Sequence, residues 1–399
     1  MDLTVAALPF LYKKGEKMII KPNDPHLVYS GRIDHENESE PVLVYAGSFI
    51  RLRFKGGSKI SVTVKNYRNC YKDSLGVILD GVQTKFFLSN TSEENTYVIA
   101  DKGEDGSLRA CGETAFTVEE QADRDSVMDS LLKKQTDDHH DLLIFKRMDA
   151  AHAVGFLGLE IEGEVELSDP PARPKLKMEV FGDSVSCGEV SEMVERTGQS
   201  DPEGHEGMYS NSWNAYGWLT ARNLDAEVHL TSQGGIALFD KTGYFNGPEL
   251  DTMLGVLSCY DKTQYNPGIK LPVTDWDFSK YIPDICIIAI GQNDANPGNI
   301  MAEDYDGQKA VEWRRAYKGF VETLMDKYEN CSFVLITTVL MHDPAWDKAI
   351  GEVCDSIGSE RVHHFMFTRN GAATPGHPRI AEHEEMAREL TEFIKRSVL

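Results

Sequence analysis

The sequence predicts a two-part protein of the α/β class, in which an all-β sandwich precedes a parallel sheet covered by helices on both faces. Three observations predict it. Up to residue 167 the chain consists of short apolar or alternating runs separated by turn residues. From residue 176 onward, near-continuous apolar runs alternate with helical patterns, which is typical of a buried parallel sheet. The stretch 168–175 between them holds three prolines and is predicted to be a linker.

The first part, residues 1–167, is predicted to form the sandwich. Within it, Ile60, Val62 and Val64 alternate with polar residues, so one face of that strand is expected to be wet. A charged stretch near 119–138 lacks β-branched residues and is expected to be an inserted helix or loop. The expected strands cover residues 26–34, 42–54, 59–65, 75–88, 96–100, 141–147 and 154–161.

The second part, residues 176–399, is predicted to form the parallel sheet and its helices. Residues 241–283 carry few periodic signals and many turn formers, so we expect a long loop region near the functional site. The expected strands cover 177–181, 226–231, 285–290, 333–340 and 361–367. The expected helices cover 213–224, 308–328, 344–357 and 378–396.

Composition excludes several classes of protein. With 41 Lys and Arg against 64 Asp and Glu, the formal charge is −23, so nucleic acid and anionic membranes are not expected partners. The longest apolar runs, such as 285–290, are too short to span a bilayer. No signal peptide opens the chain, and the seven cysteines are odd in number and scattered. We therefore expect a cytoplasmic protein in a reducing compartment.

Polar residues with catalytic potential follow four of these elements. Ser184 follows the first strand of the second part, Gly234 follows the second, and Asn293 follows the third. His377 opens the last helix. Because the carboxyl ends of parallel strands meet at one edge of a sheet, we expect these residues to lie close together.

A hydroxyl, an imidazole and several N–H donors are what acyl transfer requires. Ser184 is the candidate nucleophile and His377 the base that takes its proton. The Ser184 N–H, the Gly234 N–H and the Asn293 side-chain amide are the candidate oxyanion donors, and the spacing also allows Gly235. Taken singly, these residues could also serve only as a helix cap or as turn formers.

The four blocks resemble the SGNH hydrolases of the GDSL superfamily over residues 176–399. That resemblance implies a flavodoxin-like sheet and assigns the same roles to Ser184, His377, Gly234 and Asn293. Segments 29–34 and 276–284, together with Gly376-His377-Pro378, resemble carbohydrate esterase family 2 more narrowly. Its members carry an N-terminal jelly-roll-like sandwich and remove acetyl groups from plant polysaccharides such as xylan and mannan.

One position departs from the superfamily pattern. Most SGNH enzymes carry an aspartate three residues before the catalytic histidine, and this chain has Thr374 there. The resemblance to family 2 implies a Ser–His dyad oriented by a backbone carbonyl. A carboxylate from elsewhere, such as Asp343 or Glu382, is the alternative that the residues leave open.

Aromatic rings stack on sugar faces, so tryptophans near the site are candidate substrate platforms. Trp213, Trp276 and Trp346 are predicted to lie in loops or at helix starts, and packing between helix and sheet is the alternative for each. Neither a P-loop nor GxGxxG occurs, and His383 is not followed by the second histidine of HExxH. No organic cofactor and no metal are expected.

We therefore expect a carbohydrate esterase that removes O-acetyl groups from xylan- or mannan-type oligosaccharides through an acyl-enzyme on Ser184. The expected partner is the acetylated oligosaccharide, and the sequence carries no signal for an oligomeric state. Two alternatives stay open. One is an SGNH esterase or lipase that acts on non-carbohydrate esters or thioesters. The other is a catalytically inert carbohydrate-binding protein.

Overall fold

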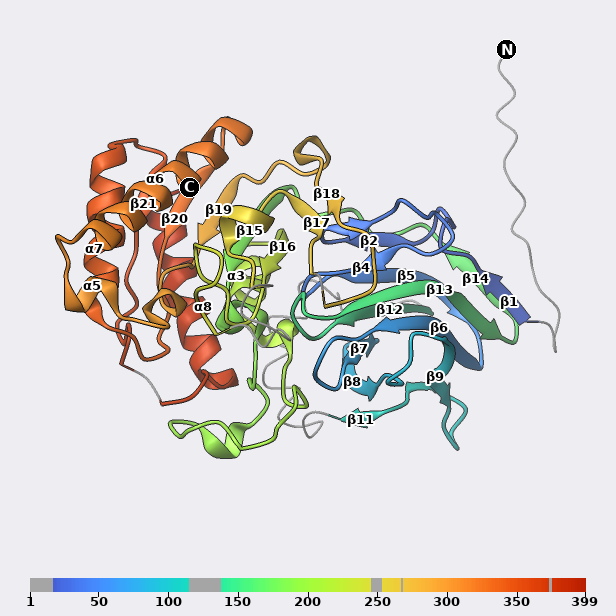
Figure 1. Ribbon diagram of the computed structural model, residues 1–399. Helices are drawn as coiled ribbons and strands as arrows, with labels where there is room; N and C mark the ends of the chain where they lie inside the picture. The colour runs from blue at the N-terminus through green and yellow to red at the C-terminus, as the bar shows by residue number, and fades with distance from the viewer. Residues whose placement is uncertain (1–16, 115–137, 245–252, 267, 373–374) are drawn as a thin grey trace, which may run out of the picture.

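The computed structural model describes residues 17–114, 138–244, 253–266, 268–372 and 375–399 of the chain. A β-rich part lies beside a helix-covered parallel sheet, as Figure 1 shows. The predicted fold class is confirmed. Most of the charged insert expected near 119–138, up to residue 137, lies outside the described residues, as does Thr374.

In the described residues, the β-rich part consists of two antiparallel sheets. In the first, the strand order is β10-β9-β6-β13-β4-β3, and β1 pairs with β13. Its strands are β1 (Lys17–Ile20), β3 (Ile33–Asp34), β4 (Val42–Leu43), β6 (Lys59–Tyr67), β9 (Glu94–Lys102), β10 (Leu108–Ala110) and β13 (Ala153–Glu162).

In the second sheet, the order is β11-β8-β7-β12-β5-β14, and β2 pairs with β5. Its strands are β2 (Val28–Ser30), β5 (Phe49–Gly56), β7 (Ser74–Leu79), β8 (Val82–Phe87), β11 (Glu113–Thr114), β12 (His139–Lys146) and β14 (Val165–Ser168). Apolar side chains of both sheets, such as Ile60, Phe156 and Ile144, share one buried cluster. The sandwich core is therefore built from the inward-facing half of each strand.

The parallel sheet has the order β16-β15-β19-β20-β21, which in chain order is 2-1-3-4-5, the flavodoxin-like arrangement. Its strands are β15 (Leu176–Gly182), β16 (Ala226–Ser232), β19 (Ile285–Ile288), β20 (Ser332–Leu335) and β21 (Val362–His364). β20 and β21 end before the predicted 340 and 367, and the residues that follow them form loops. The order reverses between β15 and β19, so a ligand site is expected beyond their carboxyl ends.

Four long helices cover the two faces of this sheet. Residues of α3 and α8 pack on one face, and residues of α6 and α7 pack on the other. Their bounds are α3 (Tyr216–Asn223), α6 (Gln308–Lys327), α7 (Pro344–Ile357) and α8 (Ile380–Ser397). The predicted helix 213–224 divides at Ala215 into a 3-10 turn, η3 (Ser212–Asn214), and α3.

Short elements complete the second part. The predicted loop region 241–283 contains a helical turn, a two-stranded hairpin and a 3-10 turn, which the sequence pattern did not indicate. The short elements are α2 (Ser184–Cys187), η2 (Val194–Arg196), α4 (Val256–Cys259), β17 (Lys262–Gln264), β18 (Thr274–Asp275), η5 (Phe278–Lys280), η6 (Asn293–Ala295) and α5 (Ile300–Glu303).

Buried charges connect the two parts. Arg32 of the β-rich part forms an ion pair of 2.9 Å with Glu179 on β15, and both side chains are buried. Lys85 and Arg147 both bind Glu192, at 2.8 and 2.7 Å. The two parts also share hydrophobic clusters, so the division into two domains joined by 168–175 stays a prediction.

All seven cysteines are free thiols. Among the described residues, no helix has both the length and the apolar character needed to cross a membrane.

Candidate active site

The predicted nucleophile sits where β15 meets a one-turn helix. Ser184 is the first residue of α2, and Asp183 caps this helix by accepting the Val185 N–H at 3.1 Å. A side chain at Gly182 would place its Cβ only 2.1 Å from Ser186 Oγ, so only glycine allows a turn this tight. The strand end and the cap thus hold the Ser184 hydroxyl at the carboxyl edge of the sheet.

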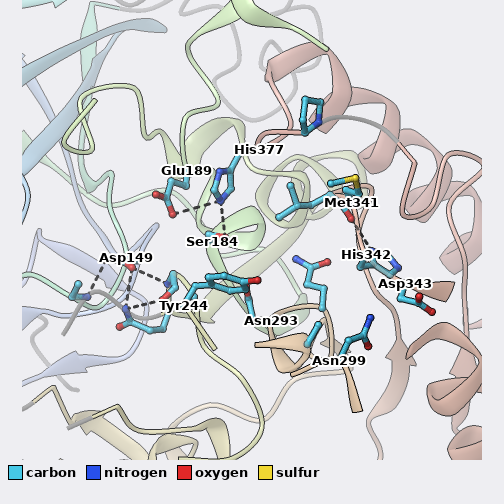
Figure 2. Close-up of a pocket in the computed structure, with 18 of the residues that line it drawn as sticks. Asp149, Ser184, Glu189, Tyr244, Asn293, Asn299, Met341, His342, Asp343 and His377 are labelled. Atoms are coloured by element: carbon cyan, nitrogen blue, oxygen red, sulfur yellow. Dashed lines mark hydrogen bonds and ion pairs between the residues drawn. The ribbon is translucent and has the colours of Figure 1, made fainter. Parts of the chain in front are cut away.

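His377 meets Ser184 as predicted. Its Nε2 lies 2.9 Å from Ser184 Oγ (Figure 2). On the other side of the ring, its Nδ1 lies 2.6 Å from Asp201 Oδ2. Because the Asp201 carboxylate accepts a hydrogen bond from the Nδ1–H, the other ring nitrogen, Nε2, carries no proton and can accept the serine hydroxyl. The three side chains have the geometry of a catalytic triad.

Asp201 is the orienting group that the sequence analysis missed. Its Oδ1 also accepts the His377 N–H at 3.1 Å and forms an ion pair of 2.9 Å with Arg379. The alternatives act elsewhere, since Asp343 caps α7 and Glu382 accepts the Arg379 N–H. Because Asp201 lies 176 residues from His377 in a polar loop, no local spacing could have identified it.

The charges around the triad shift its pKa values. Burial lowers the pKa of His377, but the carboxylates of Glu189, Asp201 and Asp183 outweigh burial and raise it above its ordinary value. Burial raises the pKa of Asp201, but the hydrogen bond and the charge of His377, together with Arg379, outweigh burial and lower the pKa to about 2. Asp201 is therefore ionised at neutral pH.

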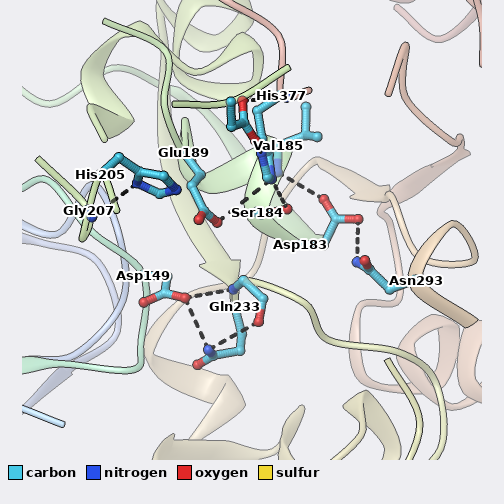
Figure 3. Close-up of polar contacts among 12 residues, drawn as sticks. Asp149, Asp183, Ser184, Val185, Glu189, His205, Gly207, Gln233, Asn293 and His377 are labelled. Atoms are coloured by element: carbon cyan, nitrogen blue, oxygen red, sulfur yellow. Dashed lines mark hydrogen bonds and ion pairs between the residues drawn. The ribbon is translucent and has the colours of Figure 1, made fainter. Parts of the chain in front are cut away.

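The three predicted oxyanion residues line one pocket, but the N–H groups of two of them already donate hydrogen bonds to carboxylates. The Gly234 N–H donates to Asp149 Oδ2 at 2.8 Å (Figure 3). Asn293 donates one amide hydrogen to Asp183 Oδ2 at 2.9 Å, which leaves its second hydrogen for a ligand. Gly235 lies in the same wall, and its N–H makes no hydrogen bond to another described residue. The choice between Gly234 and Gly235 thus stays open.

Asp183 fixes the position of the Asn293 side chain through a hydrogen bond. Its buried carboxylate accepts hydrogen bonds from the side chains of Gln292 and Asn293 and from the Val185 N–H. Burial raises the pKa of Asp183 to about 6, although these donors act in the opposite direction. One buried carboxylate therefore ties the strand β15 turn to the strand β19 turn across the point where the strand order reverses.

The pocket has a volume of about 810 Å³, and both parts of the chain contribute to its walls. The β-rich part supplies Cys70, Tyr71, Asp149 and Ala151. Tyr244 lines the pocket, and the residue is 61 % exposed. Tyr244 comes from the region predicted to be loop, and the sequence carried no signal that set it apart from the other tyrosines.

The structure contradicts the choice of tryptophans as platforms. Trp213 packs against Phe145 and Trp218, and its exposed fraction is 9 %. Trp276 lies under Arg32 with the same exposed fraction, and Trp346 packs against Trp313 and is fully buried. None of the three lines the pocket. Packing in the interior accounts for all three, although only as contact with other buried side chains and not as helix against sheet in each case.

Comparisons with known proteins show which families this chain is similar to. Residues 29–109 match the family described as carbohydrate esterase 2 N-terminal. Over 228 residues, the chain is 33 % identical to an acetylxylan esterase / glucomannan deacetylase of Cellvibrio japonicus, covering 55 % of this chain and 57 % of that protein. By these matches the chain is similar to the family 2 carbohydrate esterases.

The chain also resembles a cellulase/esterase, CelE, of Acetivibrio thermocellus, with 25 % identity over 94 % of this chain and 40 % of that protein. It therefore spans less than two thirds of the length of these curated relatives. A solved family two carbohydrate esterase from Cellvibrio japonicus shares the fold, with a TM-score of 0.70 and 24 % identity over 96 % of this chain and 98 % of that one.

Proposed function

We propose that this protein is a carbohydrate esterase that removes O-acetyl groups from xylan- or mannan-type oligosaccharides. The observation that carries the proposal is the hydrogen-bonded series Ser184–His377–Asp201, which opens into a pocket with an exposed tyrosine at its wall. The names of the curated relatives, an acetylxylan esterase / glucomannan deacetylase and a cellulase/esterase, support the substrate class.

In the proposed reaction, Ser184 Oγ attacks the acetyl carbonyl carbon while His377 Nε2 takes its proton. The oxyanion is held by the Ser184 N–H, the free amide hydrogen of Asn293 and a backbone N–H of the 234–235 segment. For Gly234 to take that part, Asp149 has to release its N–H, whereas Gly235 can act without this step. His377 then protonates the departing sugar hydroxyl, and water hydrolyses the acetyl-enzyme by the reverse sequence of proton transfers.

The experiment that tests the proposal is a comparison of four substrates. Wild-type protein is incubated with acetylated xylo-oligosaccharide, acetylated glucomanno-oligosaccharide, nitrophenyl acetate and a long-chain nitrophenyl ester. We expect acetate release from at least one oligosaccharide and little turnover of the long chain, because polar side chains such as Asp149, Glu189 and Asn293 share the pocket walls with the apolar ones. Rapid turnover of the long chain without sugar deacetylation would instead establish the non-carbohydrate esterase. Glycan binding without turnover of any substrate would favour the alternative of a catalytically inert carbohydrate-binding protein.

Tyr244 should act on sugar binding rather than on the chemistry. Its exposed ring can cover a sugar face, so Tyr244→Ala should raise KM for acetylated oligosaccharides about five- to tenfold and leave nitrophenyl acetate unaffected. Tyr244→Phe retains the ring and is the matched control, with KM expected to stay near the wild-type value. Equal losses on both classes of substrate would mean that Tyr244 shapes the triad instead.

A further inference from the structure

Glu189 is a second carboxylate beside the triad that the reaction described above does not use. Its Oε2 lies 3.8 Å from His377 Nε2, the same nitrogen that faces Ser184 Oγ at 2.9 Å (Figure 3). The backbone fixes this position, because the Glu189 N–H donates to Ser184 O at 3.0 Å and Gly188 ends α2 in the left-handed conformation, with φ 71°. Glu189 thus reaches His377 from the nucleophile's side.

The charge of Asp201 is balanced before the reaction begins. Asp201 lies 2.9 Å from the guanidinium of Arg379, whose side chain is fully buried. When His377 takes the serine proton, a further positive charge appears, and Asp201 stabilises it while it is also paired with Arg379. Among the described residues, neither Lys nor Arg forms an ion pair with Glu189. Its charge is therefore available for the imidazolium.

The neighbouring carboxylate of Asp149 already accepts hydrogen bonds from groups other than His377. Its carboxylate accepts the N–H groups of Gly234 and Ala151 and the side-chain amide of Gln233. A Cβ at Gly234 would lie 2.6 Å from Asp149 Oδ2 and 3.3 Å from Glu189 Oε2, so the missing side chain makes room for both carboxylates. Of the two, only Glu189 lies within 4 Å of the imidazole.

We propose that Glu189 is a catalytic residue that stabilises the His377 imidazolium in the transition state. This rests on the proposed function. As the bond from Ser184 Oγ to the acetyl carbon forms, the serine proton moves to His377 Nε2 and the carbonyl electron pair moves to the oxyanion. Burial raises the pKa of Glu189, and the charge of His377 acts in the opposite direction. In the proposed step Glu189 acts in its ionised form and exchanges no proton. It acts through its charge alone, which at this distance favours the charged form of the imidazole.

Several groups besides Glu189 face His377, and they set the background of any pH profile. Asp201 and Asp183 favour the imidazolium. Arg379 faces the imidazole through Asp201, and burial lowers the pKa of His205 and of His383. The charge of Glu189 is the largest single cause that raises the pKa of His377, ahead of the Asp201 hydrogen bond and the Asp201 charge taken separately. Its removal should therefore be visible above that background.

Glu189→Gln retains the shape and removes the charge. We expect kcat/KM on its high-pH plateau to fall about tenfold for acetylated oligosaccharides and equally for nitrophenyl acetate. The acidic limb should move to lower pH by about one unit, because neutral His377 is the active form and its pKa falls without the carboxylate. An NMR titration of His377, assigned by its absence in His377→Ala, should show the same shift.

Two matched variants accompany it. Glu189→Asp keeps the charge and should retain much of the activity and of the His377 pKa. Glu195→Gln removes an exposed carboxylate six residues further along and should leave both unchanged. An unmoved His377 titration in Glu189→Gln would overturn the inference. So would a loss confined to sugar substrates, which would make Glu189 a ligand of sugar hydroxyls.

Failure of the proposed function gives a different result. In that case wild-type protein would release no acetate that depends on Ser184, whatever the state of Glu189. The NMR titration needs no turnover, so it still decides whether Glu189 and His377 are coupled by charge.

Discussion

Ser184→Ala should reduce kcat/KM for acetate release by about a hundred-thousandfold or more. The Ser184 hydroxyl contacts His377 Nε2 and lies at the carboxyl end of β15, so its removal leaves the acetyl carbon without the proposed nucleophile. The residual rate should come from the oxyanion donors and substrate binding alone. Acetate release measured under substrate-saturating and substrate-limiting conditions checks this.

Ser186→Ala is the matched control for that variant. Ser186 lies on the same helical turn, but its hydroxyl pairs with Tyr216 OH at 2.8 Å and does not line the pocket. Its activity should stay within a few-fold of wild type. Because Ser184 and His377 act as a unit, the double variant Ser184→Ala/His377→Ala should be no slower than either single variant. Substantial sugar deacetylation by Ser184→Ala would contradict the proposed mechanism.

Asp201→Asn should lower kcat by about a hundred- to ten-thousandfold. An amide in place of the carboxylate can donate to His377 Nδ1, which would favour the tautomer that carries its proton on Nε2 and so cannot accept from Ser184. The loss of the charge also lowers the pKa of His377. The acidic limb of kcat/KM, which in wild type should lie above the ordinary histidine value, should therefore move to lower pH.

Asp343→Asn controls for the loss of a different carboxylate at the same pocket. Asparagine caps a helix as well as aspartate does, so α7 should persist and activity should change little. The free energy of unfolding of Asp201→Asn, measured in urea, separates a catalytic loss from a folding defect, because Asp201 also binds Arg379. Near-normal activity of a folded Asp201→Asn variant would contradict this role of Asp201. It would favour the hypothesis that a backbone carbonyl orients His377.

Much of the fold follows from the local pattern. The helix at 344–357 begins and ends as predicted, because Asp343, Pro344 and Gly358 provide the cap, the first-turn proline and the left-handed end. The short elements of the predicted loop region 241–283 do not follow from the local pattern. Among them, β17 and β18 depend on hydrogen bonds to distant chain segments, such as that from Thr274 to Asp34, and not on periodicity.

The sequence by itself determined the fold class and brought Ser184, Asn293 and His377 to one edge. Each stands at the end of a strand or the start of a helix, and a parallel sheet collects such ends on one side. Only the tertiary structure decided which carboxylate orients His377, which N–H groups are already occupied, and which aromatic ring faces the pocket. Asp201, Asp149 and Tyr244 come from loops whose positions depend on long-range packing, and nothing in their local sequence records those contacts.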